Sequence, residues 1–384
     1  MNLLYFTHER EYGGSSRALI SLLKELKKDK NHHIYVIVPF KDAKIIPALE
    51  KLDINVIVSF YSWWQIPVHV SRIKKMLFKI AYLFNFFSEK ILIRKIKKLD
   101  IDIIHSNTSV IDIGARIANK LKIPHVWHFR EFKDNNLIFI KGEKKSYEFI
   151  NQFGGNIIYI SKAIEKFYKP KINQVETKLI YDGVSDDFII KDKEYKEKYD
   201  DIKFLLAGTL QKSKGQHLAV EAVGILKEAG YKNIKLYLAG GDTLKFSNYL
   251  NTLMEKYHIK ENVEYLGFVN DIKELRKKVD VELLCSESEA FGLVTVEGMM
   301  AGNLMIGSNS GATTEIIEDG VTGILYQCND KNDLADKMRK VMDYPNMIKN
   351  IGIKGQKEAI ERFSSERNAV LILEYYNKIL KESI

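Results

Sequence analysis

The sequence has few cysteine and proline residues and no long apolar run. Its two cysteines, Cys285 and Cys328, have neither metal-ligand nor redox spacing, so we expect no disulfide framework. The first residues, MNLLYFTHEREYGG, lack the basic stretch and the long apolar stretch of a secretory signal. The apolar run at 76–87 is too short to cross a membrane and contains Lys79. These absences predict a folded, cytoplasmic protein.

Two nucleotide-binding motifs and a metal motif are also missing. No stretch fits G-x-G-x-x-G after a first strand, and none fits the P-loop, which weakens a dehydrogenase or NTPase interpretation. The D-x-D triplet at 100–102 opens an expected strand, where its carboxylates lie at the amino end and away from a ligand site. We therefore expect no metal site and no cofactor.

What the sequence does contain is a repeated α/β pattern. Continuous apolar runs alternate with helical stretches, as is typical of parallel strands that are covered on both faces. Helices are expected at 16–29 and 218–230, among others. The expected strands are 2–7, 34–39, 55–59, 102–106, 124–129, 156–161, 202–208, 234–240, 263–268, 281–286 and 303–308.

The α/β pattern starts again near residue 200, after a polar stretch at 191–201. We predict two doubly wound, Rossmann-like domains, 1–190 and 191–365, that face each other across a cleft. A last helix at about 366–384 is expected to pack back on the first domain. Ligands of such sheets bind at the carboxyl ends of the strands.

The most informative segment is SESEAFGLVTVEGMMAG, at 286–302. It places Glu289 and Glu297 eight residues apart, with an expected helix start near Phe291 or Gly292 between them. Free backbone N–H groups at a helix start suit a diphosphate. Eight helical residues span roughly 12 Å, more than the roughly 5–9.5 Å between the carboxylates of a glycosidase pair. The spacing favours two carboxylates that grip opposite ends of one extended ligand, although two solvated glutamates would show the same pattern.

This segment resembles the E-x7-E motif of the retaining glycosyltransferases of the GT-B fold, the family four group. The resemblance implies that Glu289 contacts the donor sugar and that Glu297 holds the ribose hydroxyls. It also places the backbone of Phe291, Gly292 and Leu293 at the phosphates. The donor would be a nucleotide diphosphate sugar, linked to UDP or GDP.

Other stretches resemble the family in the same order along the chain. Gly13 and Gly14 match its N-terminal glycine loop, and GTLQKSKG at 208–215 matches the loop whose Arg and Lys neutralise the diphosphate. Lys214 fits that lysine, but Thr209 stands where the arginine usually is, and a hydroxyl cannot replace a bidentate guanidinium. The segments LAGGD (238–242) and GFV (267–269) match the part of the family that lines the nucleotide base pocket. The donor-binding residues implied here are Gly13, Gly14, Gly208, Thr209, Lys214, Gly241, Phe268 and Val269.

The first domain contributes polar residues at expected strand ends. His128, in PHVWHFRE, stands where many family members have a histidine close to the transferred sugar. With Lys214 and Glu289 it is a candidate catalytic residue, and we expect it to orient the sugar or its acceptor. His105 and Arg130 are candidates for the acceptor side, with structural roles as the alternative.

The net charge of the chain is +9, and segment 66–100 carries nine basic residues and two acidic residues. We expect one or two helices at 71–99. One stripe is expected to face the core and a second stripe, Phe78, Tyr82 and Phe86, lies beside Lys75 and Lys79. This composition is typical of a helix on an anionic membrane surface, and also of a helix that neighbours cover on two sides. The expected core stripe is Ile73, Met76, Leu77, Ile80, Phe84 and Phe87.

We therefore interpret the chain as a retaining, metal-independent hexosyltransferase that acts on an acceptor hydroxyl of a glycan or a lipid-linked molecule. Bacterial surface polysaccharide or glycolipid assembly is the expected setting, at the inner face of the cell membrane. Two alternatives stay open. The first is a non-catalytic glycosyltransferase-like partner subunit, and the second is a nucleotide-sugar epimerase of the same architecture. The basic segment lacks a nucleic-acid reading motif, so no nucleic-acid partner is expected.

Overall fold

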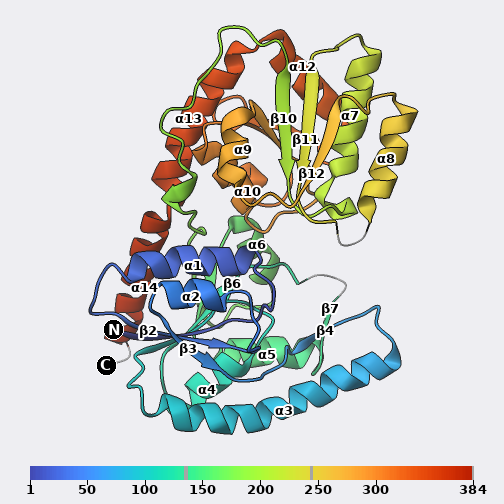
Figure 1. The fold of residues 1–384 in the computed structure, drawn as a ribbon. Coiled ribbons are helices and arrows are strands. Elements are labelled where there is room, and N and C mark those ends of the chain that lie inside the picture. Colours follow the sequence, from blue (N-terminus) through green and yellow to red (C-terminus); the bar gives the residue numbers. More distant parts are fainter. Residues whose placement is uncertain (134–136, 243–244, 383–384) are drawn as a thin grey trace. The chain divides into compact units, whose positions relative to one another are not determined.

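The computed structural model describes residues 1–133, 137–242 and 245–382 (Figure 1). The chain forms two compact units, Met1–Gly183 with Ser365–Ile384 and Val184–Ser364. The polypeptide leaves the N-terminal unit a few residues before the boundary expected at 190/191. It returns with the last helix, α14 (Ser365–Glu382), which contacts α1 (Gly14–Leu26) of that unit.

Among the described residues, the main sheet of the N-terminal unit has seven strands in the order β3-β2-β1-β5-β6-β8-β9. Every pairing in this sheet is parallel. A short antiparallel pair, β4 and β7, lies outside it. The strands are β1 (Asn2–Phe6), β2 (His33–Val38), β3 (Asn55–Val58), β4 (Gln65–Pro67), β5 (Ile103–Ser106), β6 (His125–Phe129), β7 (Leu137–Phe139), β8 (Asn156–Tyr159) and β9 (Glu176–Leu179).

Helices cover both faces of this sheet, as the continuous apolar strands predicted. Successive residues of β1 point to opposite faces: Leu3 and Tyr5 belong to a core with α1 and α14, and Leu4 and Phe6 to a core with α4. The helices, besides α1 and α14, are α2 (Ile46–Lys51), α3 (Arg72–Ile96), α4 (Ile113–Leu121), α5 (Glu143–Phe153) and α6 (Lys162–Tyr168).

The described part of the C-terminal unit has a second parallel sheet, with six strands in the order β12-β11-β10-β13-β14-β15. The strands are β10 (Ile202–Ala207), β11 (Ile234–Ala239), β12 (Val263–Gly267), β13 (Val281–Leu284), β14 (Leu304–Ser308) and β15 (Ile324–Tyr326). The helices are α7 (Gln216–Glu228), α8 (Phe246–Lys256), α9 (Ile272–Lys278), α10 (Leu293–Met300), α11 (Thr313–Ile316), α12 (Lys331–Asp343) and α13 (Asn346–Phe363), with short 3₁₀ turns at Asp186–Phe188 and Lys212–Lys214. The predicted doubly wound α/β class is confirmed.

The strand order of each sheet reverses at its first strand. In the C-terminal unit β10 pairs with β11 on one side and with β13 on the other. In the N-terminal unit β1 lies between β2 and β5 in the same way. Chain segments after two such neighbouring strands diverge to opposite faces, which leaves a crevice at the carboxyl ends where ligands of open α/β sheets bind.

Helix α3 is one continuous helix, but the stripe that was expected to face the core points outward. Ile73 is 68% exposed and Phe87 61% exposed, and the four other residues of that stripe are exposed as well. The buried side instead contains Tyr82, Asn85 and Glu89. The expectation was wrong because it followed apolar residues alone, whereas this face is buried through paired polar groups.

These polar groups of α3 all have partners. Tyr82 donates to the Asp112 carboxylate, the Asn85 amide bonds the Ser62 backbone in both directions, and Glu89 pairs with two basic residues of α4. Buried polar groups are tolerated when they are paired in this way. Within the described ranges, no helix has both the length and the apolar character needed to cross a bilayer.

Candidate active site

Three loops that follow neighbouring strands of the C-terminal unit are joined by backbone hydrogen bonds. Gly208 follows β10 and its N–H donates to Ala239 O (2.8 Å), and Leu210 N–H donates to Gly241 O (2.8 Å). Gly240 in turn donates to Gly267 O (2.8 Å) at the end of β12. A Cβ on Gly240 would lie 2.0 Å from Gly208 O, so only glycine permits this approach.

The predicted residues of these loops line one edge of the sheet. Thr209 is exposed, and Phe268 is 77% exposed, the largest value among the exposed apolar side chains described. Val269 is half-buried and packs beneath, against a small apolar cluster. An exposed aromatic ring at the carboxyl end of a parallel strand is suited to stack on a planar ring.

The structure brings Lys214 and Glu289 together across the switch point. Lys214 ends the 3₁₀ turn after β10, and Glu289 lies in the loop between β13 and α10. Lys214 Nζ donates to Glu289 Oε1 at 2.6 Å, with the two side chains 34% and 15% exposed. A half-exposed cation at this edge can exchange its carboxylate partner for an anionic ligand.

The loop that carries Glu289 is fixed by its neighbours on two sides. Glu287 N–H donates to Ser213 O (3.2 Å), which ties it to the Lys214 turn. Ala312 N–H donates to Glu289 O (2.9 Å), so the turn after β14 supports the backbone of Glu289 itself. The turn that contains Ala312 therefore helps to fix the position of Glu289.

Helix α10 begins one or two residues after the predicted start. Gly292 is its N-cap with φ +99°, a conformation that favours glycine, and its carbonyl accepts from Thr295 and Val296. The Phe291 side chain is buried against Phe363 (centroids 5.7 Å apart). The Phe291 side chain is therefore not available to a ligand, and the contact of the 291–293 backbone with phosphates stays a prediction.

Glu297 has a buried ionic partner that the sequence did not indicate. Arg276 on α9, with no exposed surface, donates through Nη1 to Glu297 Oε2 (3.0 Å) and through Nε to Glu282 (3.0 Å). Asn303 Nδ2 donates to Glu282 Oε1 (2.7 Å). Burial lowers the pKa of Arg276, but the two carboxylates outweigh this and raise it.

The two predicted glutamates thus differ in setting. Glu289 is at the edge of the sheet, while Glu297 is only 4% exposed and one of its oxygens is committed to Arg276. The predicted contact of Glu297 with ribose stays a prediction. Arg276 was missed because a single arginine in a basic helix, ELRKKVD, gives no signal that it is buried.

In the N-terminal unit, the predicted glycine loop precedes α1. Gly13 is the N-cap and Gly14 the first residue of the helix. The start of α1 already holds an anionic group of the protein, because Glu9 Oε2 accepts from Ser16 N (3.0 Å) and Ser16 Oγ (2.5 Å). A carboxylate is favourable at this position for the same reason that a phosphate is.

His105, His128 and Arg130 lie together in the interior of the N-terminal unit. Arg130 Nη2 lies 3.2 Å from His128 Nδ1, and since a guanidinium only donates, Nδ1 must accept. His105 Nε2 also lies 3.2 Å from His128 Nδ1 and is therefore a donor. The other ring nitrogen of His105, Nδ1, then accepts from Tyr376 Oη at 2.6 Å. Burial, reinforced by Arg130, lowers the pKa of both histidines well below the usual value, so both rings are neutral.

This assignment leaves His128 Nε2 with a hydrogen and no acceptor. The atom is fully buried, has no hydrogen-bond partner among the described residues, and lies 3.8 Å from Asp182 Oδ1. Asp182 is engaged by Arg130, which also donates to Asn107 Oδ1 (3.0 Å). An unpaired buried donor is unusual, because it costs roughly 1–3 kcal/mol.

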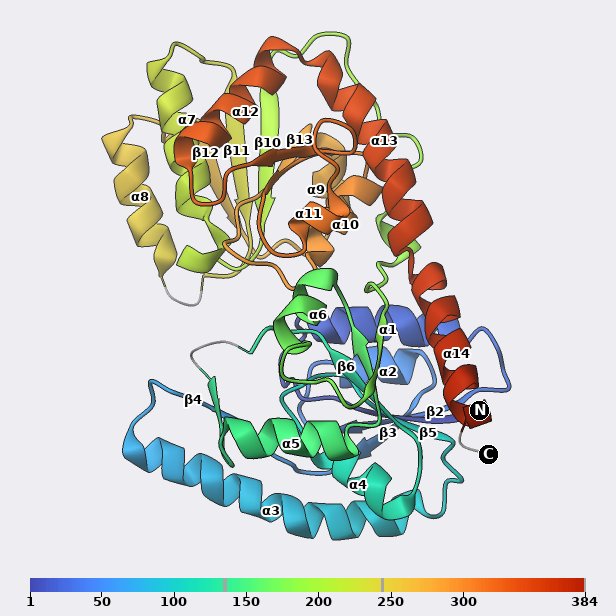
Figure 2. The ribbon, with the colours of Figure 1, turned by 180° about the vertical axis from the view of Figure 1, so that it is seen from behind.

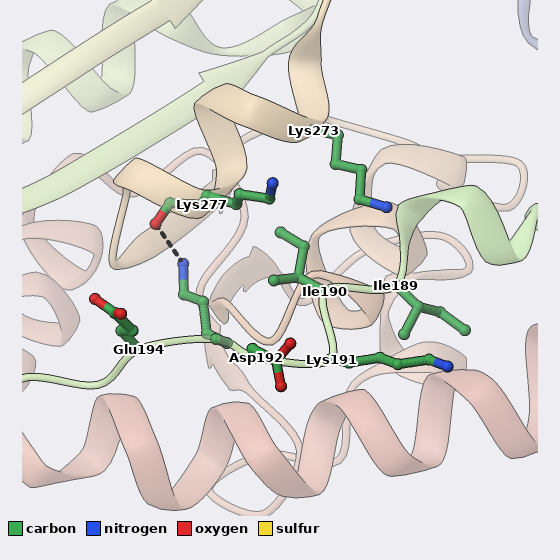
Figure 3. Close-up of a pocket in the computed structure, with 8 residues that line it drawn as sticks. Ile189, Ile190, Lys191, Asp192, Glu194, Lys273 and Lys277 are labelled. Atoms are coloured by element: carbon green, nitrogen blue, oxygen red, sulfur yellow. Dashed lines mark hydrogen bonds between the residues drawn. The ribbon is translucent and has the colours of Figure 1, made fainter.

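A pocket of about 440 Å³ lies apart from these residues (Figure 3). It is formed by segment 189–194 and α9, and none of the predicted site residues lines it. Lys193 Nζ bonds the carbonyls of Arg276 (2.8 Å), Lys277 (3.4 Å) and Val279 (2.7 Å). This lysine therefore caps the end of α9. In the part of the chain that the structure describes, no three His, Cys, Asp or Glu side chains gather as a metal site would require.

The chain contains two α/β units, each built on a parallel sheet, and its charged residues and glycines lie in the loops at a switch point of the strand order. This is the architecture of the GT-B glycosyltransferases. Residues 12–188 match the family Glycosyltransferase Family 4, and residues 187–358 match the family Glycosyl transferases group 1. The chain belongs to the glycosyltransferases of the GT-B fold.

Similar proteins agree with this family. An uncharacterized glycosyltransferase of Methanocaldococcus jannaschii is 27% identical over 316 residues, which are 78% of this chain and 81% of that protein. The capsular polysaccharide biosynthesis glycosyltransferase CapM of Staphylococcus aureus is 25% identical over 198 residues, half of each chain. The crystal structure of Anabaena HepE in complex with UDP and glucose has a TM-score of 0.79, with 19% identity, and covers 98% of this chain and 100% of that chain.

Proposed function

We propose that this protein is a retaining glycosyltransferase that moves a sugar from a UDP- or GDP-linked donor to an acceptor hydroxyl. The observation that carries the proposal is the Lys214–Glu289 pair, at the carboxyl ends of β10 and β13. Anabaena HepE, which shares the fold, was crystallised in complex with UDP and glucose, and this supports a nucleotide sugar as donor.

In this proposal the donor diphosphate lies at Lys214 and the start of α10, and the base lies against Phe268. The nucleotide that leaves gains negative charge, so fixed positive groups stabilise the transition state more than the ground state. Glu289 holds the sugar, and Glu297 holds the ribose. No nucleophilic side chain is assigned. The acceptor oxygen therefore bonds to the anomeric carbon on the same face from which the diphosphate oxygen departs, and a phosphate oxygen of the departing nucleotide accepts the acceptor proton. Attack on the face of departure gives retention.

His128 is assigned a place beside the sugar in this proposal. Its Nε2–H is the free donor of a fixed network and is suited to orient a hydroxyl oxygen. Its lowered pKa makes it a weak base, which favours orientation over proton abstraction. No metal is required in this proposal, because the lysine and the helix start supply the positive charge.

The acceptor is proposed to be a glycan or a lipid-linked molecule in bacterial surface polysaccharide or glycolipid assembly, at the inner membrane face. The similarity to CapM, a glycosyltransferase of capsular polysaccharide biosynthesis, supports this setting. Segment 66–100 is the proposed contact with the membrane.

The decisive experiment uses the purified chain and a panel of UDP and GDP sugars. A donor that binds raises the melting temperature, by an amount that grows with its concentration. Transfer or slow hydrolysis of that donor, with the anomeric configuration of the product followed by NMR and EDTA present, then tests the reaction. An inverted product would refute retention, and loss of activity in EDTA would refute metal independence.

One observation favours a second function. Thr209 is exposed at the place where the family has an arginine that neutralises the diphosphate. A non-catalytic chain that stabilises an active partner has no need of that arginine. Donor binding without turnover by the purified chain would support this alternative, and turnover would eliminate it.

A further inference from the structure

Among the described elements, α3 carries the most exposed large apolar side chains. Eight exposed side chains, spaced so that they recur every three or four residues, occupy one side of the helix over roughly 27 Å. Figures 1 and 2 show α3 along the periphery of the N-terminal unit. These residues, called the α3 outer face below, are Ile73, Met76, Leu77, Ile80, Leu83, Phe84, Phe87 and Ile91.

Basic residues border the α3 outer face. Arg72, Lys79 and Lys90 are exposed and are spaced by seven and eleven residues, which places them along one margin of this face. Lys90 Nζ lies 4.2 Å from the ring centre of Phe86, itself 47% exposed. Long basic side chains beside aromatic rings are typical of helices that lie in a membrane interface.

The α3 outer face carries no negative charge. The sole acidic residue between Arg72 and Ile96 is Glu89, which is buried and paired with Arg116 and Lys120 of α4. The side of the helix that meets solvent is therefore apolar and purely cationic. This charge excludes some partners and favours others.

A second copy of this chain would oppose one cationic margin with another, and like charges that face each other are destabilising. A nucleic acid would match the charge but would leave the two phenylalanines and six aliphatic side chains of this face against water. An anionic bilayer complements both features, since lysine and arginine contact the headgroups while the apolar side chains enter the acyl boundary.

We propose that the α3 outer face docks on an anionic lipid bilayer, with α3 parallel to the membrane plane. This docking depends on α3 alone, so it holds whether or not the proposed transfer reaction is correct. Because the inserted residues are already outward, docking needs no rearrangement of the core.

The test is cosedimentation of the full chain with vesicles of phosphatidylcholine alone or mixed with phosphatidylglycerol. We expect binding to the mixed vesicles only. The triple variant Leu77→Gln, Phe84→Gln, Phe87→Gln is expected to lower the partition coefficient at least roughly tenfold. The triple variant Arg72→Gln, Lys79→Gln, Lys90→Gln is expected to abolish the preference for anionic lipid, and high salt should act in the same way on the unaltered chain.

Matched controls come from α13 and α14. Ile353→Gln with Val370→Gln removes apolar side chains of similar exposure (46% and 42%), and Lys349→Gln with Lys354→Gln and Lys357→Gln removes an equal positive charge. Both controls should bind like the unaltered chain. Melting temperatures establish that each variant is folded, and donor binding in the absence of vesicles should be unaltered in all of them.

Three results would overturn the proposal. The first is failure of the unaltered chain to bind anionic vesicles, and the second is equal binding by the apolar triple variant. The third is a dimer in solution that the apolar triple variant dissociates while vesicles bind neither protein, which would assign the α3 outer face to a second copy.

Discussion

The Nζ of Lys214 and the Oε1 of Glu289 lie 2.6 Å apart, although the two residues are separated by 75 positions in the sequence. Each comes from the loop after one of the two strands at the switch point. The pair therefore places one positive and one negative group where a ligand that carries both hydroxyls and phosphates would enter. The proposed function depends on this juxtaposition.

Lys214→Met should lower kcat by about 100- to 1,000-fold, because a fixed charge aimed at the leaving diphosphate is lost. Lys214→Arg should recover part of the activity, since the charge remains but its geometry differs. Steady-state kinetics with the donor identified in the panel provides the measurement.

The control is the Lys331–Glu221 pair of the same unit, with a similar distance (2.5 Å) and similar exposure (37% and 14%). Lys331→Met should leave kcat within about twofold of the unaltered value, because this pair joins α12 to α7 and does not lie in the loops after β10 and β13, so its charge is not aimed at the leaving group. Comparable losses in Lys214→Met and Lys331→Met would show that Lys214 has no catalytic role.

The fold could be predicted from the sequence because its signal is local and repeated. Continuous apolar strands and intervening helices indicated the class, and the strands 202–208 and 234–240 lie within a residue of β10 and β11. The short strands β4, β7, β9 and β15 were missed, because runs of only three or four residues are too short to give such a signal.

In the C-terminal unit the positions of the site loops could be predicted, because each loop follows a strand that the sequence indicates. The contact between Lys214 and Glu289 could not be predicted, because a pairing across 75 residues depends on the order of the strands in the sheet. For α3 the pattern failed differently. Tyr82, Asn85 and Glu89 are buried by specific partners, and such partners cannot be read from hydrophobic periodicity.

Arg276→Met should reduce the free energy of unfolding by about 3–5 kcal/mol, since it leaves Glu282 and Glu297 buried without their cation. Glu297→Gln keeps an acceptor for Arg276 and should cost about 1–3 kcal/mol. Urea unfolding measures both changes.

The matched control is Glu274→Gln, which removes an exposed carboxylate of α9 and should change stability by less than about 0.5 kcal/mol. If Glu297 also holds the ribose, Glu297→Gln should raise the donor KM in protein that remains folded at the assay temperature. A normal KM would remove Glu297 from the site and leave it a structural residue.

Stability should fall as the pH is lowered below about 6.5, because buried histidines must gain protons. Burial lowers the pKa of His125 to about 4, and its Nδ1 donates to Gly154 O (2.9 Å). The contribution of His125 to the free energy of unfolding is fully present above the unfolded-state pKa. It is lost as the pH falls toward 4, and the loss amounts to about 3 kcal/mol.

Urea unfolding at pH 7 and pH 5 tests this histidine effect. His125→Gln should be less stable than the unaltered chain at pH 7, and its stability should change less between the two values. His33 lies in an exposed position at the start of β2, so His33→Gln is the matched control and should keep the full pH dependence. An identical pH dependence in His125→Gln would contradict the assignment.

Tyr376 holds the far end of the network that leads to His128. The chain of donors runs from Tyr376 Oη to His105 Nδ1 and from His105 Nε2 to His128 Nδ1, so Tyr376→Phe leaves a buried acceptor unpaired. We expect a loss of about 1–2 kcal/mol in stability and a decrease in kcat of roughly three- to tenfold with an unchanged donor KM, since Tyr376 acts by positioning. Tyr375→Phe is the control, because the buried Tyr375 hydroxyl has no hydrogen-bond partner among the described residues, and this substitution should change neither stability nor kcat.

Nitrogen-15 NMR of the histidine rings supplies a readout that a change in stability alone does not alter. His105 should have its hydrogen on Nε2 in both the unaltered chain and Tyr376→Phe, because His128 Nδ1 remains its acceptor, and in Tyr376→Phe the His105 Nδ1 signal should move downfield as that nitrogen loses its donor. An Nδ1–H signal in the unaltered chain would show that the donors run in the opposite direction.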